Sequence, residues 1–355
     1  MTDSPQPVAV VIGAGLIGAS IGCALVEAGY AVHLRDAKLS HARVAAGLGA
    51  GTIEPAVSAH VGIVVVAVPP AAIAEVVVHS LQTYPYATVT DVGSVKAEVL
   101  DALWRREVDL ARYVGSHPMA GSQHSGPLTA RKDLFTDRTW VITPHRRSAN
   151  ASVEAVRAVV QAARAREILM DVDEHDAAVA RVSHLPHLMS VLMAAHLNSV
   201  PNEDLLLAGQ GLRDVTRIAG SDPGLWQQIL RANAGAVLRE LKGVQEQLAA
   251  LISAVEAGPS DLRDQLELGI AGTRRIPGKH GTPQVAYRQI VVAIPDAPGA
   301  LARLFADVGE AGVNVEDISI EHDPVREIGY LELSVAPTQA DDLARTMVER
   351  GWSVS

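Results

Sequence analysis

Short apolar runs alternate with helical stretches along the first 170 residues of the chain. Four early runs have the length of strands, and they span residues 8–12, 31–34, 63–68 and 88–91. The run at residues 63–68 is continuously β-branched, as expected of a strand buried on both faces. Helical patterns fill the intervals, as at residues 17–27 and 71–79. Later runs at residues 114–115, 140–143 and 168–170 extend the set. This order predicts an α/β domain with a Rossmann-like doubly wound sheet over residues 1–170.

The pattern becomes wholly helical from residue 171 to residue 256. Apolar side chains recur there at helical spacing, as in Val179, Val182, Leu185, Met189 and Leu192. Ser221-Asp222-Pro223 has the composition of a helix start, and the helix predicted after it is apolar as far as Leu251. Because so apolar a helix needs packing partners, we predict an all-α second domain over residues 171–256.

The C-terminal part of the chain returns to a mixed pattern. Residues 257–283 are polar and rich in Gly, Arg and Lys, which predicts a linker with one short helix near residues 262–268. Strand patterns at residues 290–294, 315–320, 330–335 and 352–354 enclose two amphipathic helical patterns, one ending at Gly309 and one over residues 339–350. The order βαββαβ predicts a small α+β domain over residues 284–355.

Composition narrows the classes of partner. The 355 residues carry a net charge of −10, and no stretch combines clustered Lys and Arg with aromatic residues, so we expect no nucleic acid partner. No apolar run is long enough to span a membrane, and residues 1–7 lack a signal-peptide core. A single cysteine, Cys23, fits a reducing compartment. We therefore predict a cytoplasmic protein.

A glycine-rich turn follows the first strand. Gly13, Gly15 and Gly18 lie between that strand and a helix, which is the context of a dinucleotide-binding fingerprint. The first glycine permits the tight turn, the second lets the backbone approach a pyrophosphate, and the third allows helix and strand to pack closely. Asp36 ends the second strand, where a carboxylate binds the ribose hydroxyls of NAD and repels a 2′-phosphate. NADP stays an alternative cofactor, because the guanidinium of Arg35 could bind that phosphate.

The rest of the predicted cofactor site surrounds this turn. Leu16 and Ile17 begin the helix whose amides would bind the phosphates. Val68 and Pro69 end the third apolar run, and they complete the predicted NAD site at the same edge of the sheet.

Two further polar residues fall just beyond predicted strand ends. Ser94 follows the strand at residues 88–91, and His117 lies in the run Gly-Ser-His-Pro-Met-Ala-Gly at residues 115–121. Ligands of an open parallel sheet bind at this edge, so both residues are candidates for the nicotinamide cleft. A cofactor that takes a hydride and a histidine that takes a proton are the two halves of an alcohol oxidation. The simpler alternative for His117 is a histidine that stabilises a loop.

The helical domain contains two pairs of candidate binding residues. His184 and His187 are three residues apart and share a helix face, and we predict a kink at Pro186 between them. We expect no metal site here, because the sequence offers no third ligand beside the two histidines. Arg213 and Arg217 are four residues apart, and paired guanidiniums suit a dicarboxylate substrate. The alternative is that both arginines are solvated helix charges paired with Asp214.

Four ordered motifs make the chain resemble the prephenate and arogenate dehydrogenases of tyrosine biosynthesis. They are Asp-Val-Gly-Ser-Val-Lys at residues 91–96, the run at residues 115–121, Val-Ser-His-Leu-Pro-His at residues 182–187, and Gly-Leu-Arg-Asp-Val-Thr-Arg-Ile-Ala at residues 211–219 followed by Ser-Asp-Pro at 221–223 and Trp226. The resemblance covers nearly the whole chain. It implies NAD-dependent oxidative decarboxylation of prephenate, a cytoplasmic enzyme and a homodimer that pairs through the helical domain.

The same resemblance implies roles for particular residues. His117 accepts the proton of the ring hydroxyl and Ser94 orients that hydroxyl, while Arg217 binds the ring carboxylate. Arg213 lies toward the pyruvyl side chain, and His184 and His187 belong to the substrate cleft without a metal ion. Arogenate, or both substrates, is the closest alternative, because the two differ only in a keto or an amino group on the side chain. A β-hydroxyacid dehydrogenase and a non-catalytic amino-acid sensor are remoter ones.

The C-terminal domain resembles an ACT domain. Its markers are Pro-Asp-Ala-Pro-Gly-Ala-Leu at residues 295–301 and Val-Asn-Val at residues 313–315. The resemblance implies an amino-acid effector, with tyrosine as the expected one, bound by Asp296, Pro298, Gly299 and Asn314. The alternative is a domain that serves only dimerisation.

Overall fold

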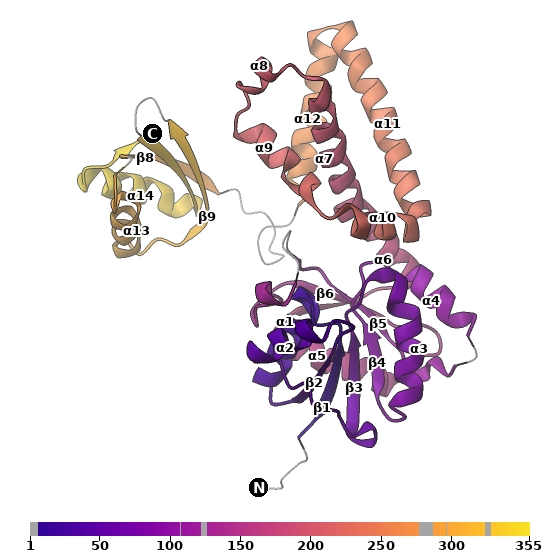
Figure 1. Ribbon diagram of the computed structural model, residues 1–355. Coiled ribbons are helices and arrows are strands. Elements are labelled where there is room, and N and C mark those ends of the chain that lie inside the picture. The colour runs from indigo at the N-terminus through magenta and orange to yellow at the C-terminus, as the bar shows by residue number, and fades with distance from the viewer. Residues whose placement is uncertain (1–5, 107, 122–125, 277–286, 296, 324–327) are drawn as a thin grey trace. The chain divides into compact units, whose positions relative to one another are not determined.

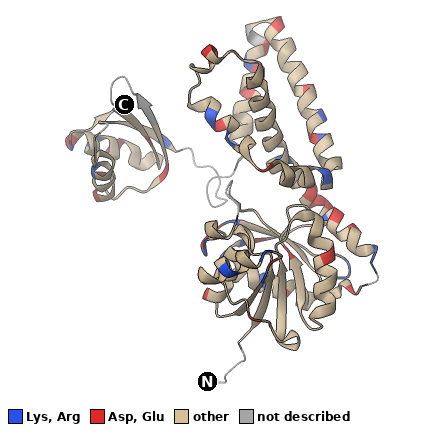
Figure 2. Cartoon of the chain, in the orientation of Figure 1, with Lys and Arg blue, Asp and Glu red and all other residues tan. Residues whose placement is uncertain are grey.

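The computed structural model describes residues 6–106, 108–121, 126–276, 287–295, 297–323 and 328–355. The chain forms two compact units, residues 1–250 and residues 251–355. Figure 1 shows the parallel sheet and the helical bundle of the first unit, and the smaller sheet of the second. No helix in the described ranges is long and apolar enough to cross a membrane. Figure 2 shows Lys and Arg positions scattered among Asp and Glu.

The first domain is built on a parallel sheet of order β2-β1-β3-β4. Its strands are β1 (Val8–Ile12), β2 (Ala31–Arg35), β3 (Val61–Val66) and β4 (Thr88–Asp91). The helices of this part are α1 (Leu16–Glu27), α2 (Leu39–Gly47), α3 (Ile73–Thr83) and α4 (Ala97–Trp104). β2 lies on one side of β1, and the chain then crosses to the other side of β1 to form β3. Ligands bind at the carboxyl ends of the strands at such a switch point.

Alternate residues of the central strands bury opposite faces of the sheet. Val10, Val64 and Val66 pack in the cluster that includes α3 and α4. Their neighbours Val11 and Val65 pack in the cluster that includes α1, α2 and α5 (Asn150–Ala162). Both faces are therefore covered, which explains why these strands read as continuous apolar runs.

A second sheet, of order β5-β6-β7, continues the domain. Its strands are β5 (Gly115–Pro118), β6 (Thr139–Thr143) and β7 (Arg166–Leu169). β5 pairs antiparallel with β6, whereas β6 and β7 are parallel and are joined through α5. In the described part of the connection from β5 to β6, the one helical element is the short 3-10 turn Pro127–Thr129. Parallel neighbours are usually joined by a longer crossover helix, whereas antiparallel neighbours do not need one. The sequence pattern did not indicate this reversal.

The helical domain starts with one interrupted helix. α6 (Val172–Val179) passes through a single π-helical turn (Ala180–His184) into α7 (Leu185–His196). Pro186 occupies the first turn of α7, where its missing N–H costs little, so the predicted kink takes the form of a π turn just before it. The remaining helices of this part are α8 (Asn202–Leu205), α9 (Gln210–Thr216), α10 (Pro223–Ala232) and α11 (Ala234–Ala257).

The predicted linker at residues 257–283 needs a correction. α12 (Pro259–Thr273) is a helix of 15 residues, longer than the short one expected there. Gly258, at a φ of 134°, ends the preceding helix, and Pro259 then occupies the first turn of the new one. The Leu, Glu, Gln and Ala residues that follow are good helix formers, although the stretch looks polar overall.

The βαββαβ order of the C-terminal domain is confirmed. Its elements are β8 (Arg288–Pro295), α13 (Ala300–Glu310), β9 (Val315–Asp323), β10 (Ile328–Val335), α14 (Pro337–Glu349) and β11 (Ser353–Val354). The strands form an antiparallel sheet of order β11-β8-β10-β9, which is the ferredoxin-like arrangement. Inward side chains such as Val292, Leu331 and Leu333 form its core with both helices.

Candidate active site

The glycine turn between β1 and α1 has no room for side chains at two of its three glycines. Gly13 has a φ of 99°, and a Cβ there would lie 2.2 Å from the carbonyl oxygen of Ala67. A Cβ on Gly18 would lie 1.8 Å from the carbonyl oxygen of Gly13. At Gly15 a Cβ would meet nothing within 4 Å. The first and third glycines thus serve packing, and the second faces the open space that a pyrophosphate would fill.

The surroundings of the turn suit a dinucleotide. α1 begins at Leu16, and its first turn has no acidic residue, so its free amides are available to an anion. Leu16 is buried and Ile17 is half-buried. The Ala67 amide donates to the Ile12 carbonyl over 2.7 Å, which places Val68 and Pro69 directly after the part of β3 that borders the turn.

Asp36 is bonded to the glycine turn itself. Its Oδ2 accepts the Ala14 amide at 2.7 Å, and its Oδ1 accepts the Lys38 amide at 2.7 Å. Each oxygen keeps a lone pair for a ribose hydroxyl. The guanidinium of Arg35 donates to the carbonyls of Leu34, Ile53 and Glu54 at distances between 2.7 and 3.3 Å. Arg35 is therefore used in holding the loop after β2, which weakens the case for a 2′-phosphate ligand at this position.

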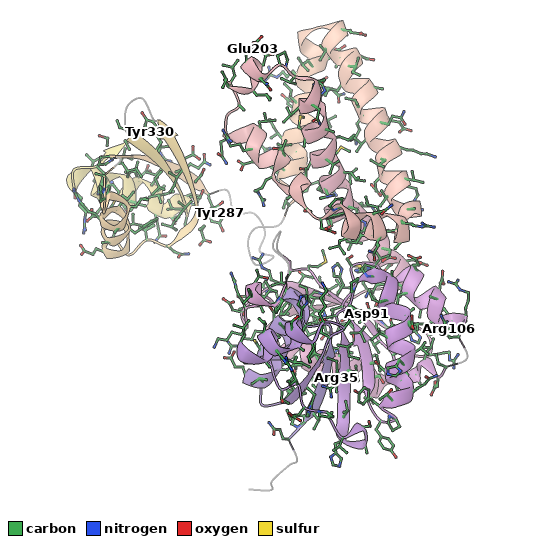
Figure 3. The ribbon with its side chains drawn as sticks, in the orientation of Figure 1. Arg35, Asp91, Arg106, Glu203, Tyr287 and Tyr330 are labelled. Carbon is green, nitrogen blue, oxygen red and sulfur yellow. The ribbon has the colours of Figure 1, made fainter. Side chains whose placement is uncertain are left out.

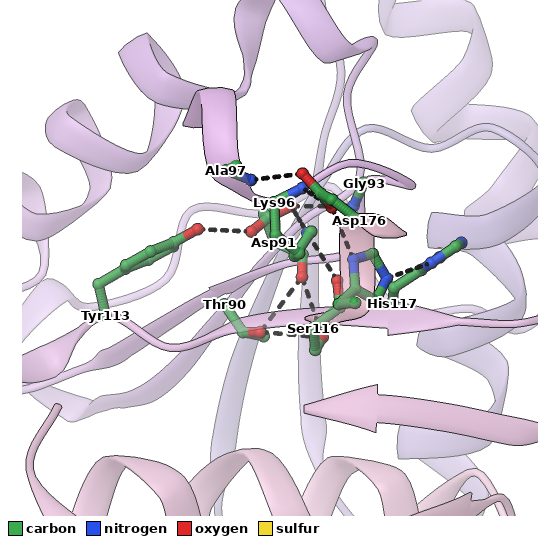
Figure 4. A network of polar contacts seen from close by, with 10 residues as sticks. Thr90, Asp91, Gly93, Lys96, Ala97, Tyr113, Ser116, His117 and Asp176 are labelled. Atoms are coloured by element: carbon green, nitrogen blue, oxygen red, sulfur yellow. Dashed lines mark hydrogen bonds and ion pairs between the residues drawn. The ribbon is translucent and has the colours of Figure 1, made fainter. Parts of the chain in front are cut away.

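His117 lies on β5 and reaches a residue of the helical domain. Its Nδ1 lies 3.0 Å from Nε2 of His175 on α6, and Nδ1 of His175 lies 2.8 Å from Oδ1 of Asp176. The carboxylate of Asp176 also accepts the amides of Lys96 and Ala97, each at 2.9 Å. The three side chains thus form a chain of hydrogen bonds that ends at the start of α4 (Figure 4).

The environment keeps His117 neutral. Burial lowers the pKa of His117 well below its ordinary value of 6.5, and the neighbouring His175, Lys96 and His184 lower it further. A neutral imidazole is able to accept a proton. The bond at Nδ1 leaves Nε2 as the ring nitrogen available to a substrate hydroxyl.

A buried ion pair supports β5 beneath His117. Nζ of Lys96 contacts Oδ1 of Asp91 and donates to the carbonyl of Ser116 over 2.7 Å, with Lys96 and Asp91 both buried. The Tyr113 hydroxyl donates to Oδ2 of Asp91 over 2.7 Å (Figure 4). The charges are paired and their remaining positions are hydrogen-bonded, which a buried ion pair requires. Figure 3 shows Asp91 inside the first domain, in contrast to Arg106 at its surface.

Ser94 lies in the turn that this ion pair spans. The turn joins β4 to α4, and the Gly93 amide donates to Oδ1 of Asp91 over 2.9 Å. Ser94 itself is half-buried. Asp91 and Lys96 therefore fix both ends of the turn, and Lys96 also binds the strand that carries His117. The prediction that His117 falls just beyond a strand end is wrong, because His117 lies within β5. That Ser94 and His117 share the nicotinamide cleft stays a prediction.

A second group of aromatic side chains lies in the helical domain. The rings of His187 and Trp226 stack with their centroids 3.5 Å apart. The ring of His184 is perpendicular to that of Trp226, with the two centroids 6.0 Å apart. Asn233 lies 3.3 Å from Nδ1 of His184. Burial lowers the pKa of His184 to about 4. Nδ1 of His187 is buried without a hydrogen-bond partner among the described residues, so it is a polar atom that a ligand could satisfy.

Comparison with known proteins identifies the family. Two family models match the chain, "Prephenate dehydrogenase, nucleotide-binding domain" over residues 21–169 and "Prephenate dehydrogenase, dimerization domain" over residues 171–268. The chain belongs to the prephenate dehydrogenase family. A Streptomyces niveus protein named "Probable prephenate dehydrogenase NovF" is 34% identical over 357 residues, which cover 97% of this chain and 98% of that protein. This membership confirms the predicted family and the predicted enzyme class, a dehydrogenase.

Solved structures of the prephenate dehydrogenase family share the fold. The prephenate dehydrogenase of A. aeolicus, in complex with hydroxyphenyl propionate and NAD+, matches with a TM-score of 0.69 at 26% identity, covering 77% of this chain and 99% of that one. Synechocystis arogenate dehydrogenase matches with a TM-score of 0.65 at 25% identity, covering 75% and 98%. The predicted fold class, a Rossmann-like domain followed by a helical domain and a small α+β domain, is confirmed.

The two arginines of the prephenate dehydrogenase motif at residues 211–219 do not share one α-helix. Arg213 lies on α9, whereas α9 ends at Thr216 and Arg217 begins the tighter 3-10 turn Arg217–Gly220. Both side chains are exposed. Asp214, the alternative partner considered for them, accepts a hydrogen bond from Gln210 over 2.8 Å. The arginines remain candidates for carboxylate binding.

Three residues of the site were not predicted from the sequence. His175 and Asp176 lie in Val-Asp-Glu-His-Asp, a run that looks like the charged first turn of a surface helix, and Lys96 belongs to a quoted motif without a role. The sequence carries no local signal for them; in the structure His175 lies shortly before the π turn Ala180–His184, and π turns often mark functional sites. In the described ranges no group of three or more His, Cys, Asp or Glu side chains has the geometry of a metal site.

The C-terminal domain has a cavity of about 300 Å³ at the loop between β8 and α13. Its lining consists of Ile294, Pro295, Ala297, Gly299, Ala300, Leu301, Ala302 and Gly329. Gly299 has a φ of 86° and provides the turn into α13. Of the other predicted effector residues, Asn314 donates to Glu316 over 2.6 Å, Pro298 lies in the same loop, and Asp296 lies outside the described residues.

Proposed function

We propose that this chain catalyses the NAD-dependent oxidative decarboxylation of prephenate to 4-hydroxyphenylpyruvate, with His117 as the proton acceptor. The observation that carries the proposal is the neutral His117, held through Nδ1 by His175, on a strand that Lys96 joins to the end of β4. The turn of Gly13, Gly15 and Gly18 belongs to the same domain, and at Gly15 it has the open space that a nucleotide needs. Bound NAD supplies the hydride acceptor. The open space at Gly15, the free amides of α1 and the carboxylate of Asp36 fit that cofactor.

The residues of the chain manage the proton and the orientation of the ring. Nε2 of His117 takes the proton of the ring hydroxyl as the hydride leaves the carbon that carries it. The bond from the ring to its carboxylate then breaks, and carbon dioxide leaves while its electron pair completes the aromatic ring. The resulting phenolate oxygen takes the proton back from His117, which gives the phenol and restores the neutral histidine. Ser94 binds the same hydroxyl and directs its hydrogen toward His117. No protein group has to form a covalent bond, because aromatisation drives the decarboxylation.

The two carboxylates of prephenate require cationic partners. We assign the ring carboxylate to Arg217 and the pyruvyl end to Arg213, whose exposed guanidiniums are suited to bidentate binding. His184 and His187 form the wall of the substrate cleft, where the unpartnered Nδ1 of His187 is available to a polar group of the substrate. Arogenate is the alternative substrate, because the proton and hydride chemistry is the same and only the side-chain nitrogen differs.

The helical domain supports a homodimer as the working form. Large apolar side chains there are exposed, and they include Val182, Leu192, Leu206, Leu207, Leu238 and Leu248, with Leu206 and Leu207 at 86% and 85% exposure. Exposed apolar side chains of this size and number on one domain are typical of an oligomer interface. We propose that two copies pair through this domain.

The C-terminal domain is proposed to regulate the enzyme. The ferredoxin-like sheet and the cavity beside Gly299 support an amino-acid effector, and tyrosine, as the transaminated product, is the proposed one. Gly329→Val would fill the cavity from β10. This variant should lose inhibition by tyrosine and keep the uninhibited kcat, with the surface variant Arg345→Ala as the control; inhibition that survives in Gly329→Val would place the effector elsewhere.

The test of the activity is NADH formation by the purified protein with NAD and either prephenate or arogenate, with the product identified chromatographically. We expect prephenate to be converted to 4-hydroxyphenylpyruvate with one carbon dioxide released per NADH. Exclusive use of arogenate would keep the assigned chemistry and change the substrate. Turnover of neither compound by protein that binds NAD would refute the proposal.

A further inference from the structure

We propose that His175 and Asp176 are positioning residues that hold His117 in the tautomer with its proton on Nδ1 and a bare lone pair on Nε2. This inference rests on the proposed role of His117 as the proton acceptor. It concerns two residues that join the helical domain to the catalytic strand, since His175 and Asp176 lie on α6 and His117 lies on β5.

Asp176 can act only as an acceptor. It receives the amides of Lys96 and Ala97, each at 2.9 Å, and it lies 2.8 Å from Nδ1 of His175. Both amides carry a hydrogen that cannot be moved, so both carboxylate oxygens are fixed as acceptors. These amides belong to the first turn of α4, so the carboxylate lies at the N-terminus of that helix. Asp176 is only 5% exposed, and an ionised group so deeply buried needs these donors.

The polarity of Asp176 determines the tautomer of His175. Because the carboxylate has no hydrogen to give, Nδ1 of His175 carries one and donates it. His175 is completely buried, and in its neutral ring a proton on Nδ1 leaves a lone pair on Nε2. The next bond, 3.0 Å long, runs from that Nε2 to Nδ1 of His117.

The tautomer of His117 follows from that of His175. With a lone pair on Nε2 of His175, Nδ1 of His117 must donate, and the neutral ring of His117 then has its lone pair on Nε2. The ring centroids of the two histidines lie 5.2 Å apart and the ring planes are inclined at 76°, which fits a bond between nitrogen atoms at the edges of both rings. Through these two hydrogen bonds, the buried carboxylate of Asp176 determines that Nε2 of His117, the atom that would meet the substrate, holds a lone pair.

The hydrogen-bonded series Asp176, His175 and His117, here called the relay, also places a carboxylate near the positive charge that forms on His117. When Nε2 accepts the substrate proton, a positive imidazolium forms in a site that already contains the cation of Lys96. The titratable groups around His117 are Lys96 and Asp91 from the β4 side, His175 and Asp176 from α6, and His184 from the π turn. Asp91 is paired with Lys96, so Asp176 is the carboxylate that remains to stabilise the imidazolium, through His175.

The tautomer of His117 can be measured directly by NMR on the full-length protein labelled with ¹⁵N-histidine. The signals are assigned with a His117→Gln variant. We expect His117 in the wild type to carry its proton on Nδ1, although free imidazole side chains prefer the other tautomer. In His175→Phe, which fills the space without an acceptor, we expect His117 to change to the Nε2–H form. A wild-type His117 with its proton on Nε2 would overturn the proposal.

Kinetics provides the second readout. We expect His175→Phe to lower kcat by about 10²-fold or more, within the range that general base catalysis contributes, with a smaller change in KM. His175→Gln offers an acceptor and a donor in place of the ring, so it should recover part of that loss. The exposed His79→Gln variant is the matched control. A kcat for His175→Phe within about threefold of wild type would overturn the proposal.

The NMR measurement needs no substrate, which separates this inference from the proposed function. A chain that shows the Nδ1–H tautomer but converts neither prephenate nor arogenate would refute the function and retain the relay. A chain that converts prephenate with His117 in the Nε2–H tautomer would do the reverse. NAD affinity checks that each variant is folded; if His175→Phe does not bind NAD, the wild-type spectrum and His175→Gln still decide the question.

Discussion

Nζ of Lys96 lies 2.7 Å from the carbonyl oxygen of Ser116, the residue directly before His117. The same ammonium group pairs with Asp91, so one buried cation joins the end of β4 to the strand that carries the proposed catalytic base. The contact explains how residues far apart in the sequence form one rigid site. Its cation also contributes to lowering the pKa of His117.

Replacing Lys96 by Met should destabilise the protein strongly. The substitution leaves the carboxylate of Asp91 buried without its cation, and breaking such a pair typically costs about 3–5 kcal/mol. We expect the free energy of unfolding of the first unit to fall by about that amount, measured by urea denaturation. The double variant Asp91→Asn with Lys96→Met removes the unpaired charge and should recover part of the loss. Equal stability of Lys96→Met and the wild type would contradict this account of the network.

Gly15 and Gly18 should respond oppositely to alanine. At Gly18 the added Cβ would lie 1.8 Å from the Gly13 carbonyl oxygen, so Gly18→Ala should lower Tm and with it all activity. At Gly15, where φ is −76° and no atom lies within 4 Å, Gly15→Ala should leave Tm within about 2 °C while it weakens NAD binding about tenfold or more. Calorimetry and NAD titration of both variants check the pair. A Gly15→Ala protein with unchanged NAD affinity would exclude the turn as the pyrophosphate site.

Replacing Asp36 by Ser should relax the preference for NAD. The carboxylate that repels a 2′-phosphate is lost, and we expect the ratio of kcat/KM for NADP to that for NAD to rise about tenfold, which corresponds to about 1.4 kcal/mol. The gain is limited because Arg35 is bonded to the carbonyls of Ile53 and Glu54 and does not turn to the phosphate. Steady-state kinetics with both cofactors measures the ratio. An unchanged ratio would remove Asp36 from the ribose site.

The acid limb of the pH profile should lie below the usual range of histidine. His117 must be neutral to accept a proton, and burial with neighbouring cationic and imidazole groups lowers its pKa well below 6.5. Activity is therefore retained at pH 6.5 and is lost only when the pH falls through the lowered value. The profile of kcat/KM for prephenate measures this limb, because it reports the free enzyme. A limb centred at or above pH 6.5 would contradict the assignment.

Sequence reasoning recovered the parts of this molecule that local patterns determine. The strands β1 and β4 have the predicted bounds: β1 is a continuous apolar run, and β4 is a short β-branched run that ends at Asp91. The glycine turn was predicted correctly as a tight turn, since the close contacts of Gly13 and Gly18 allow no other residue. The roles of Gly15 and Asp36 toward NAD stay predictions.

The rest depended on contacts between distant segments. His175 and Asp176 look like ordinary helix-surface polar residues in the sequence, and only the packing of α6 against β5 and α4 makes them part of the site. The antiparallel pairing of β5 with β6 likewise depends on contacts between the strands and not on a local pattern. α12 was underestimated because a polar composition conceals good helix formers.

The measurement that tests the central claim most directly is turnover by the His117→Asn variant with prephenate and saturating NAD, beside the wild type. Asparagine keeps a polar side chain at the site but cannot accept the proton. We predict that kcat falls by about 10²–10⁴-fold, while NAD affinity stays unchanged and KM for prephenate changes much less. A variant that keeps a kcat near that of the wild type would contradict the account.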